Sequence, residues 1–170
     1  MSLLTLKRGA QHGLLIRPRW PARELCVDER VLTKLCAIQA SLPARMTLIL
    51  TRGYEARSSG LGFARKGFRA LGIRVFCWLY PGRRQEIGEI FGANGHDIDG
   101  THIDISLRVN GRRQRLLPLG VFTPPFWQRR RVRRCAPALA LMRLALQGEG
   151  FRLHRNATES LQMHCDLPVD

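Results

Sequence analysis

The chain is poor in acidic residues and in aromatic residues, and both shortages limit what it can do. It has 13 Asp and Glu against 28 Lys and Arg in 170 residues, which gives a formal net charge of +15 at pH 7. Such a surplus indicates an anionic partner, either nucleic acid, anionic lipid or a polyanionic cell envelope. Aromatic residues make up 7% of the chain, which is few for a platform that stacks nucleic-acid bases.

Long apolar runs are also missing. No segment approaches the roughly 20 apolar residues that a membrane-spanning helix needs, so we expect no transmembrane segment. The N-terminus, Met1 to Arg8, lacks a basic region ahead of an apolar run, and we expect no secretory signal. The sequence therefore predicts synthesis as a soluble cytoplasmic protein, with any action at the cell envelope following lysis or dedicated secretion.

The cysteines lack the spacing of a metal or redox motif. All five stand singly, without a C-x-x-C pair, and their number is odd. This pattern favours reduced thiols in a reducing compartment over a disulfide framework.

The length and the 45% hydrophobic content predict one domain over residues 1–170. Residues 1–25, basic and broken by glycine and proline, are expected to form an irregular lead-in. An amphipathic helix is predicted over 28–41, because Asp28 can cap it and apolar residues then recur at helical spacing. The apolar run 46–51 is typical of a strand.

The rest of the chain alternates between helical and strand patterns. We expect a short helix from Ser58, a strand over 73–80 and an alternating strand over 101–107 that Asn110-Gly111 turns into a hairpin. Two helices, broken at Pro137, and two final strands over 151–153 and 161–165 follow, and we expect the helix over 138–146 to be buried. The order predicts an α+β domain, a mainly antiparallel sheet with helices packed on one face.

Two polar clusters carry the chemical signal. The first places two histidines and three aspartates within residues 95–104, and strand alternation puts His102 and Asp104 on one face. The second, residues 159–166, contains Glu159 and His164. A catalytic zinc ion takes three protein ligands and keeps one position open, so a metal held between two strands is the working hypothesis.

These clusters resemble a known superfamily. Residues 96–104 resemble the H-x-x-G-x-A-x-D element of the D-alanyl-D-alanine carboxypeptidases, and residues 159–165 resemble the terminal glutamate and zinc histidine of the hedgehog signalling domain, which shares that LAS-type zinc peptidase fold. Residues 50–55 resemble the strand-end turn upstream of the first motif. The resemblance covers residues 28–166 and implies a hedgehog-like or peptidase-like core.

The resemblance also implies roles for single residues. His96, Asp104 and His164 would bind Zn²⁺, and Glu159 would act as the general base for water attack on a peptide bond of a peptidoglycan stem peptide. Apart from the resemblance, the chemistry of Arg52 makes it a candidate to orient a substrate carboxylate by a bidentate contact, with an ordinary surface arginine as the alternative. Seven residues separate His96 from Asp104, one more than in the family motif, so His102 remains the alternative ligand or a neighbour of the metal.

Two other functions stay open at this point. A basic nucleic-acid-binding protein could contact phosphates through residues 129–134, with the histidines in a structural or non-catalytic metal site. The chain could also keep the fold and the metal without hydrolysis. The sequence leaves undecided which bond is cleaved, whether as a carboxypeptidase or an endopeptidase, and the oligomeric state.

Overall fold

The fold is α+β and is built around one large sheet. The computed structural model describes residues 2–20, 22–54, 60–91, 100–116, 120–154 and 161–168. Its strands are β1 (Leu3–Lys7), β2 (Gly9–Gln11), β3 (Leu14–Ile16), β4 (Glu24–Asp28), β5 (Met46–Arg52), β6 (His102–Val109), β7 (Arg112–Arg113), β8 (Arg152–Leu153) and β9 (Met163–Asp166). Its helices are α1 (Glu29–Ser41), α2 (Gly60–Leu79), α3 (Ile87–Ile90) and α4 (Pro125–Gly148), with 3-10 helices η1 (Pro81–Glu86) and η2 (Gly120–Phe122).

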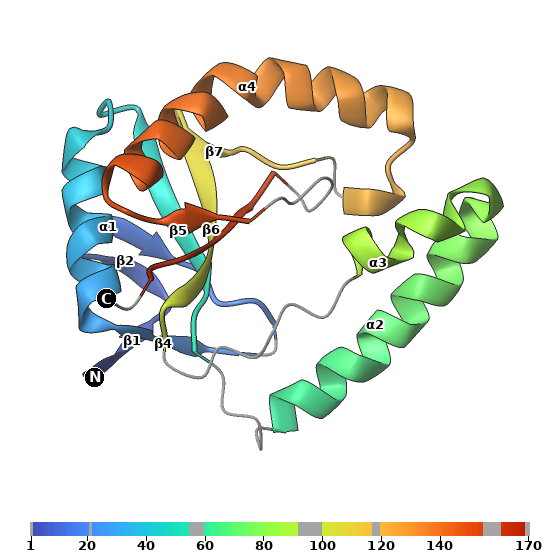
Figure 1. Ribbon diagram of the computed structural model, residues 1–170, viewed down its shortest axis with the longest axis horizontal. Coiled ribbons are helices and arrows are strands. Elements are labelled where there is room, and N and C mark those ends of the chain that lie inside the picture. The colour runs from blue at the N-terminus through green and yellow to red at the C-terminus, as the bar shows by residue number, and fades with distance from the viewer. Residues whose placement is uncertain are drawn as a thin grey trace.

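The main sheet confirms the prediction of a mainly antiparallel arrangement. Its strand order is β2-β3-β5-β6-β9-β8, with β7 paired to the end of β6. Only β3 and β5 run parallel among these described pairs, while β1 and β4 form a separate antiparallel ribbon. The last strand, β9, lies between β6 and β8, so segments far apart in the sequence lie side by side (Figure 1).

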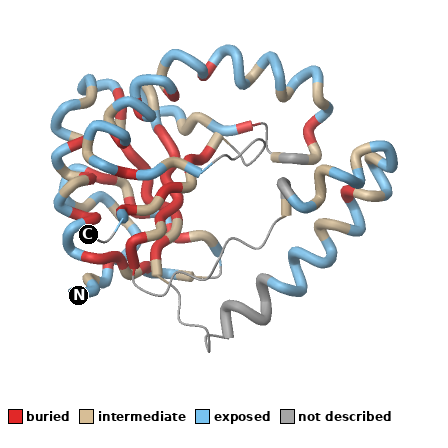
Figure 2. The backbone as a smooth tube through the Cα atoms, in the orientation of Figure 1, coloured by how far each residue is buried: buried red, intermediate tan, exposed pale blue. Residues whose placement is uncertain are grey.

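One face of the sheet holds the core, because strand alternation points the apolar side chains of β5, β6 and β9 the same way. Leu50, Ile105 and Cys165 belong to a buried cluster that includes Leu35 of α1 and Met142 of α4. Figure 2 shows the buried residues gathered between the sheet and these two helices. The helices α1 and α4 therefore cover one face, and the polar side chains of the same strands point the other way.

The start of α1 confirms the helix predicted over 28–41. The side chain of Asp28 accepts a hydrogen bond from the backbone N–H of Arg30 at 2.9 Å, which satisfies one of the first amides of the helix. Val31, Leu32, Leu35 and Ile38 are buried at helical spacing. The cap and the apolar stripe together fix where the helix begins and which side faces the core.

Replacement of Asp28 by alanine is expected to lower the free energy of unfolding by about 1 kcal/mol, the usual value of a lost N-cap. Asp28→Asn should lie much closer to the wild type, because asparagine caps equally well. Urea unfolding followed by circular dichroism measures both variants. Equal losses in the two variants would contradict the capping role.

The segment 73–80 corrects the sequence prediction, because residues 73–79 form the end of α2 and not a strand. Its β-branched and aromatic residues are typical of strands, but Phe76 is fully buried among aromatic rings. The centroid of the Phe76 ring lies 5.3 Å from that of Tyr80, one helical turn further along, and 5.7 Å from that of Phe91. Packing of this helical face outweighs the local propensity.

Three further expectations differ from the structure. Residues 1–25 contain three strands and the start of β4, not an irregular lead-in. The two helices expected around Pro137 are one helix, α4, because Cys135 and Leu139 continue a single buried face across the proline. Leu141 and Leu144 are exposed, so the helix expected to be fully buried is amphipathic. Among the described helices, none has both the length and the apolar character to cross a membrane.

Candidate functional site

Strands β6 and β9 bring four potential metal ligands together on the polar face of the sheet. In the antiparallel register, His102 lies opposite Asp166 and Asp104 lies opposite His164. Alternation along each strand sends Ile103 to the core and leaves these four side chains on the other face. The described residues of the two clusters that the sequence analysis predicts as a site are therefore adjacent in the fold.

Asp104 is the centre of this arrangement, and its side chain is 1% exposed. One carboxylate oxygen, Oδ1, lies 2.6 Å from Nδ1 of His164, and the other, Oδ2, lies 2.8 Å from a guanidinium nitrogen of Arg19. Burial acts to raise the pKa of Asp104, but the contact with His164 and the charges of Arg19 and Arg52 together hold the pKa below its ordinary value. Asp104 is thus a buried carboxylate kept in its charged form.

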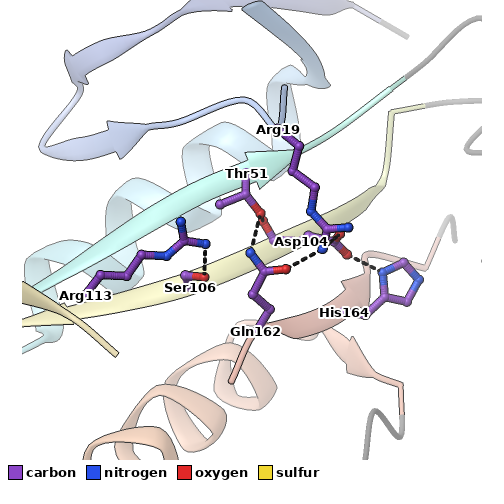
Figure 3. Close-up of polar contacts among 7 residues, drawn as sticks. All are labelled: Arg19, Thr51, Asp104, Ser106, Arg113, Gln162 and His164. Carbon is purple, nitrogen blue, oxygen red and sulfur yellow. Dashed lines mark hydrogen bonds and ion pairs between the residues drawn. The ribbon is translucent and has the colours of Figure 1, made fainter. Parts of the chain in front are cut away.

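A chain of hydrogen bonds fixes Asp104 from the side of β5 (Figure 3). Arg19, which contacts the Asp104 carboxylate, also donates to the side-chain oxygen of Gln162. Gln162 donates to the hydroxyl of Thr51 at 3.2 Å, and Thr51 donates to the backbone carbonyl of Asp104 at 3.0 Å. Because Gln162 and Thr51 are buried, this network limits the movement of the carboxylate.

Arg19 reaches the site from the loop that follows β3. The backbone N–H groups of Arg17 and Arg19 donate to the carbonyls of Leu50 and Thr51 at 2.8 and 3.2 Å, so the loop runs along the edge of β5. The loop carries its arginines onto the polar face in this way.

A second group of potential ligands lies beside the first. His102, His154 and Asp166 each offer one ligand atom, and these atoms lie within 4.8 Å of one another. His154 contacts the Asp166 carboxylate through Nε2. The ring of His154 is centred 5.0 Å from the ring of His164, and that of His102 is centred 6.1 Å from it. Three imidazoles and two carboxylates therefore line one end of the sheet.

The structure places four of the six predicted site residues. Asp104 and His164 are in direct contact, and His102 lies next to them on the same face. Arg52 ends β5 directly opposite Asp104 in the strand register. The other two, His96 and Glu159, lie outside the described residues. The roles of all six as ligands, base or substrate contact stay predictions.

Sequence reasoning missed Arg19, His154 and Asp166. Strand alternation through Met163 and Cys165 would have found Asp166, since it points the same way as His164. His154 follows the two-residue strand β8, and no motif in the neighbouring sequence marks it as a site residue. Only the pairing of β8 with β9 shows that it lies near His164. Arg19 lies in a loop, and no sequence signal predicts its contact with Asp104.

Arginines give this end of the molecule a positive potential. Besides Arg19 and Arg52, the guanidinium of Arg113 donates to the hydroxyl of Ser106 at 2.9 Å, two residues along β6 from Asp104 (Figure 3). Burial, together with the charges of Arg17 and Arg19, lowers the pKa of Arg113. The surroundings of the carboxylate would attract an anionic group of a substrate.

Comparison with known proteins gives no match. No protein-family model matches the sequence, no curated protein matches it, and no solved structure matches the fold. The arrangement of the side chains themselves is therefore the basis for assigning a function.

Proposed function

We propose that the chain is a zinc-dependent peptidase that hydrolyses peptide bonds in peptidoglycan stem peptides. The observation that carries the proposal is the contact between Asp104 and His164, two residues 60 positions apart in the sequence whose ligand atoms lie 2.6 Å from each other. The sequence alone predicts both residues as ligands of one metal ion. The resemblance to the D-alanyl-D-alanine carboxypeptidases and the hedgehog signalling domain supplies the reaction.

The chemistry of this pair fits a zinc ion. Imidazole nitrogen and carboxylate oxygen are ordinary zinc ligands, and two such atoms on one tetrahedral ion lie about 3.3 Å apart. The Asp104 and His164 atoms, 2.6 Å apart, would have to separate by about 0.7 Å to meet that requirement. Arg19 contacts the other carboxylate oxygen, Oδ2, at 2.8 Å, so zinc would replace the direct contact between Oδ1 and His164. His96, or His102 in its place, would complete the set.

The residues of the chain have separate tasks in the proposed reaction. When bound, zinc would supply a Lewis acid and lower the pKa of a water molecule toward neutrality. Arg19 orients Asp104 through Oδ2, as a neighbour that fixes a metal ligand. Glu159 would accept the proton of the attacking water. Arg52, which ends β5 beside Asp104, would bind a carboxylate of the peptide.

The positive charge fits the proposed substrate. Peptidoglycan stem peptides carry carboxylates, and Arg19, Arg52 and Arg113 surround the polar end of β6. A net charge of +15 would also concentrate the protein near an anionic envelope. The cytoplasmic origin expected from the sequence would then require release by lysis or secretion.

The zinc content of the purified chain tests the ligand assignment. We expect about one zinc per chain in the wild type, loss of the ion in His164→Ala and retention in His154→Ala, measured by mass spectrometry of the metal after dialysis. His96→Ala and His102→Ala decide the third ligand, because only the ligand's replacement should release the ion. The matched control is His12→Asn, which removes a histidine between β2 and β3. Asparagine tolerates the positive φ of 53° at this position.

Two results would contradict the proposal in different ways. Retention of zinc in His164→Ala with loss in His154→Ala would place the ion among His102, His154 and Asp166 and overturn the ligand set. Zinc binding without any cleavage of muropeptides, in the wild type as in Glu159→Gln, would leave a metal protein without hydrolysis. Cleavage that Glu159→Gln abolishes while zinc is retained supports the peptidase.

A further inference from the structure

Helix α2 presents an apolar stripe to solvent that the core and the proposed site do not use. Its exposed members recur at helical spacing and span an arc of about 100° on the helix surface. They are Phe68, Leu71, Val75, Trp78 and Leu79, exposed by 38% to 80%. Figure 2 shows this helix on the outside of the molecule, with most of its described residues exposed.

The side of α2 that packs on the fold borders the stripe and does not include it. Phe76 packs against Tyr80, Phe91 and Phe122, and the hydroxyl of Tyr80 donates to the carbonyl of Phe122 at 2.7 Å. A side chain at Gly72 would approach the ring of Phe91 to 3.2 Å, so that glycine permits close packing. The helix is thus held on the fold by the side next to the stripe, and the stripe itself stays exposed.

The apolar stripe continues into the loop that carries Arg19. The ring of Trp20, 70% exposed, packs edge-on against Phe68 with the centroids 5.3 Å apart. Its neighbour in the sequence, Arg19, contacts Asp104. The stripe therefore ends one residue from the candidate metal site, with a tryptophan at each of its ends.

The charge of α2 is entirely positive. The helix contains one lysine and three arginines and no acidic residue. Lys66, Arg69 and Arg74 are exposed, and Arg84 of η1 is exposed next to its C-terminal end. Exposed apolar and aromatic side chains beside basic ones on one helix are typical of a helix that lies in the surface of an anionic bilayer.

Other occupants fit this surface less well. A second copy of the chain would bring two molecules of charge +15 together through two positive helices. Nucleic acid would gain nothing from Leu71 or Val75, and the exposed arginines of the first half of α4 offer phosphates a better surface.

We propose that α2, with Trp20, docks the protein on an anionic lipid surface. The apolar stripe enters the interface between headgroups and acyl chains, tryptophan rings lie at headgroup level, and the basic residues contact lipid phosphates. Docking in this way holds the Arg19 loop, and with it the polar end of the sheet, close to the membrane surface.

Sedimentation of the full chain with lipid vesicles tests the proposal. We expect binding to phosphatidylcholine vesicles that contain phosphatidylglycerol and much weaker binding to phosphatidylcholine alone. Leu71→Glu and Trp78→Glu should each reduce binding by about tenfold or more, because each places a charge in the apolar stripe. The matched control is Leu144→Glu, the same change at an exposed leucine of α4, which should bind within about twofold of the wild type.

Each alternative has its own result. Equal losses of vesicle binding in Leu71→Glu and Leu144→Glu would show that binding depends on net charge alone, and would overturn the role of α2. Wild-type vesicle binding in Leu71→Glu, or no binding of the wild type to anionic vesicles, would overturn it as well. A wild-type dimer in light scattering that Leu71→Glu dissociates would assign the stripe to a second copy. Loss of DNA binding in Leu71→Glu, with vesicle binding intact, would assign it to nucleic acid. Leu71 is exposed, so circular dichroism should show an unchanged fold.

Discussion

Asp104→Asn is expected to remove zinc binding and to lower kcat/KM on a muropeptide by about a thousandfold or more, as expected when several kcal/mol of metal-supplied stabilisation are lost. Asparagine keeps the shape of the side chain but removes the negative charge that faces His164 and Arg19. A neutral amide is a poor zinc ligand in place of a carboxylate. Zinc content after incubation with zinc and dialysis, together with steady-state kinetics, measures both effects in the variant.

The control for this variant is Asp28→Asn. Asp28 is equally buried and also has an arginine partner, but it lies at the start of α1, and asparagine retains its capping role. We expect normal zinc content and normal activity in Asp28→Asn. Unchanged zinc in Asp104→Asn, or an equal loss in the two variants, would remove Asp104 from the ligand set.

The same aspartate predicts a dependence of stability on pH. Its pKa in the folded chain lies below the ordinary value of 3.8, although burial alone would raise it. The charged carboxylate therefore adds stability above pH 3.8, and this contribution is lost as the pH falls through the lower pKa of the folded state. The gap in unfolding free energy between metal-free wild type and Asp104→Asn should shrink on acidification, as urea unfolding at neutral and acidic pH would record.

Gly53→Ala is expected to lower the free energy of unfolding by about 3 kcal/mol, because the new methyl group meets backbone and not a flexible side chain. A Cβ at this position would lie 2.2 Å from the carbonyl oxygen of Cys26 and 2.8 Å from Cγ1 of Val27. That carbonyl also accepts the hydrogen bond of the Tyr54 backbone N–H at 2.7 Å. Any shift that relieves the clash breaks this link between β4 and the end of β5.

Gly67→Ala is the matched control for that change. Gly67 lies inside α2, and nothing lies within 4 Å of its missing Cβ. Alanine should therefore stabilise the chain by about 0.5 to 1 kcal/mol through its better helix propensity. Urea unfolding of both variants should shift in opposite directions. A Gly53→Ala chain as stable as the wild type would contradict the close approach of β4 and β5.

Sequence patterns correctly predicted the elements whose structure depends on interactions between residues close together in the chain. The cap and stripe of α1, the alternation of β6 and the Asn110-Gly111 turn each depend on residues a few positions apart, and all three are present. The prediction of a strand over 73–80 was wrong because the same residues have both strand-like side chains and an apolar stripe at helical spacing. Contacts of Phe76 with Phe91 and Phe122 decide between them, and those contacts are tertiary.

Strand alternation predicts only those parts of the candidate site that lie on the same strand. His102 and Asp104 share a face by their spacing, and the register of β6 and β9 places Asp104 next to His164. That the two residues bind one metal ion stays a prediction. The sequence does not contain the sheet order, so it could not bring His154 to the group. Arg19 contacts Asp104 only because its loop runs along β5, and no periodicity encodes such a path.

The place of β9 in the sheet ties the chemistry to the completion of folding. Until β9 inserts, β6 has an open edge, and β8 has no partner among the described strands. A slip of one residue in that insertion would turn His164 into the core and bring Cys165 out beside Asp104. A chain that has folded its first half, or has closed the sheet out of register, would therefore lack the contact between Asp104 and His164 on which the proposed metal site depends.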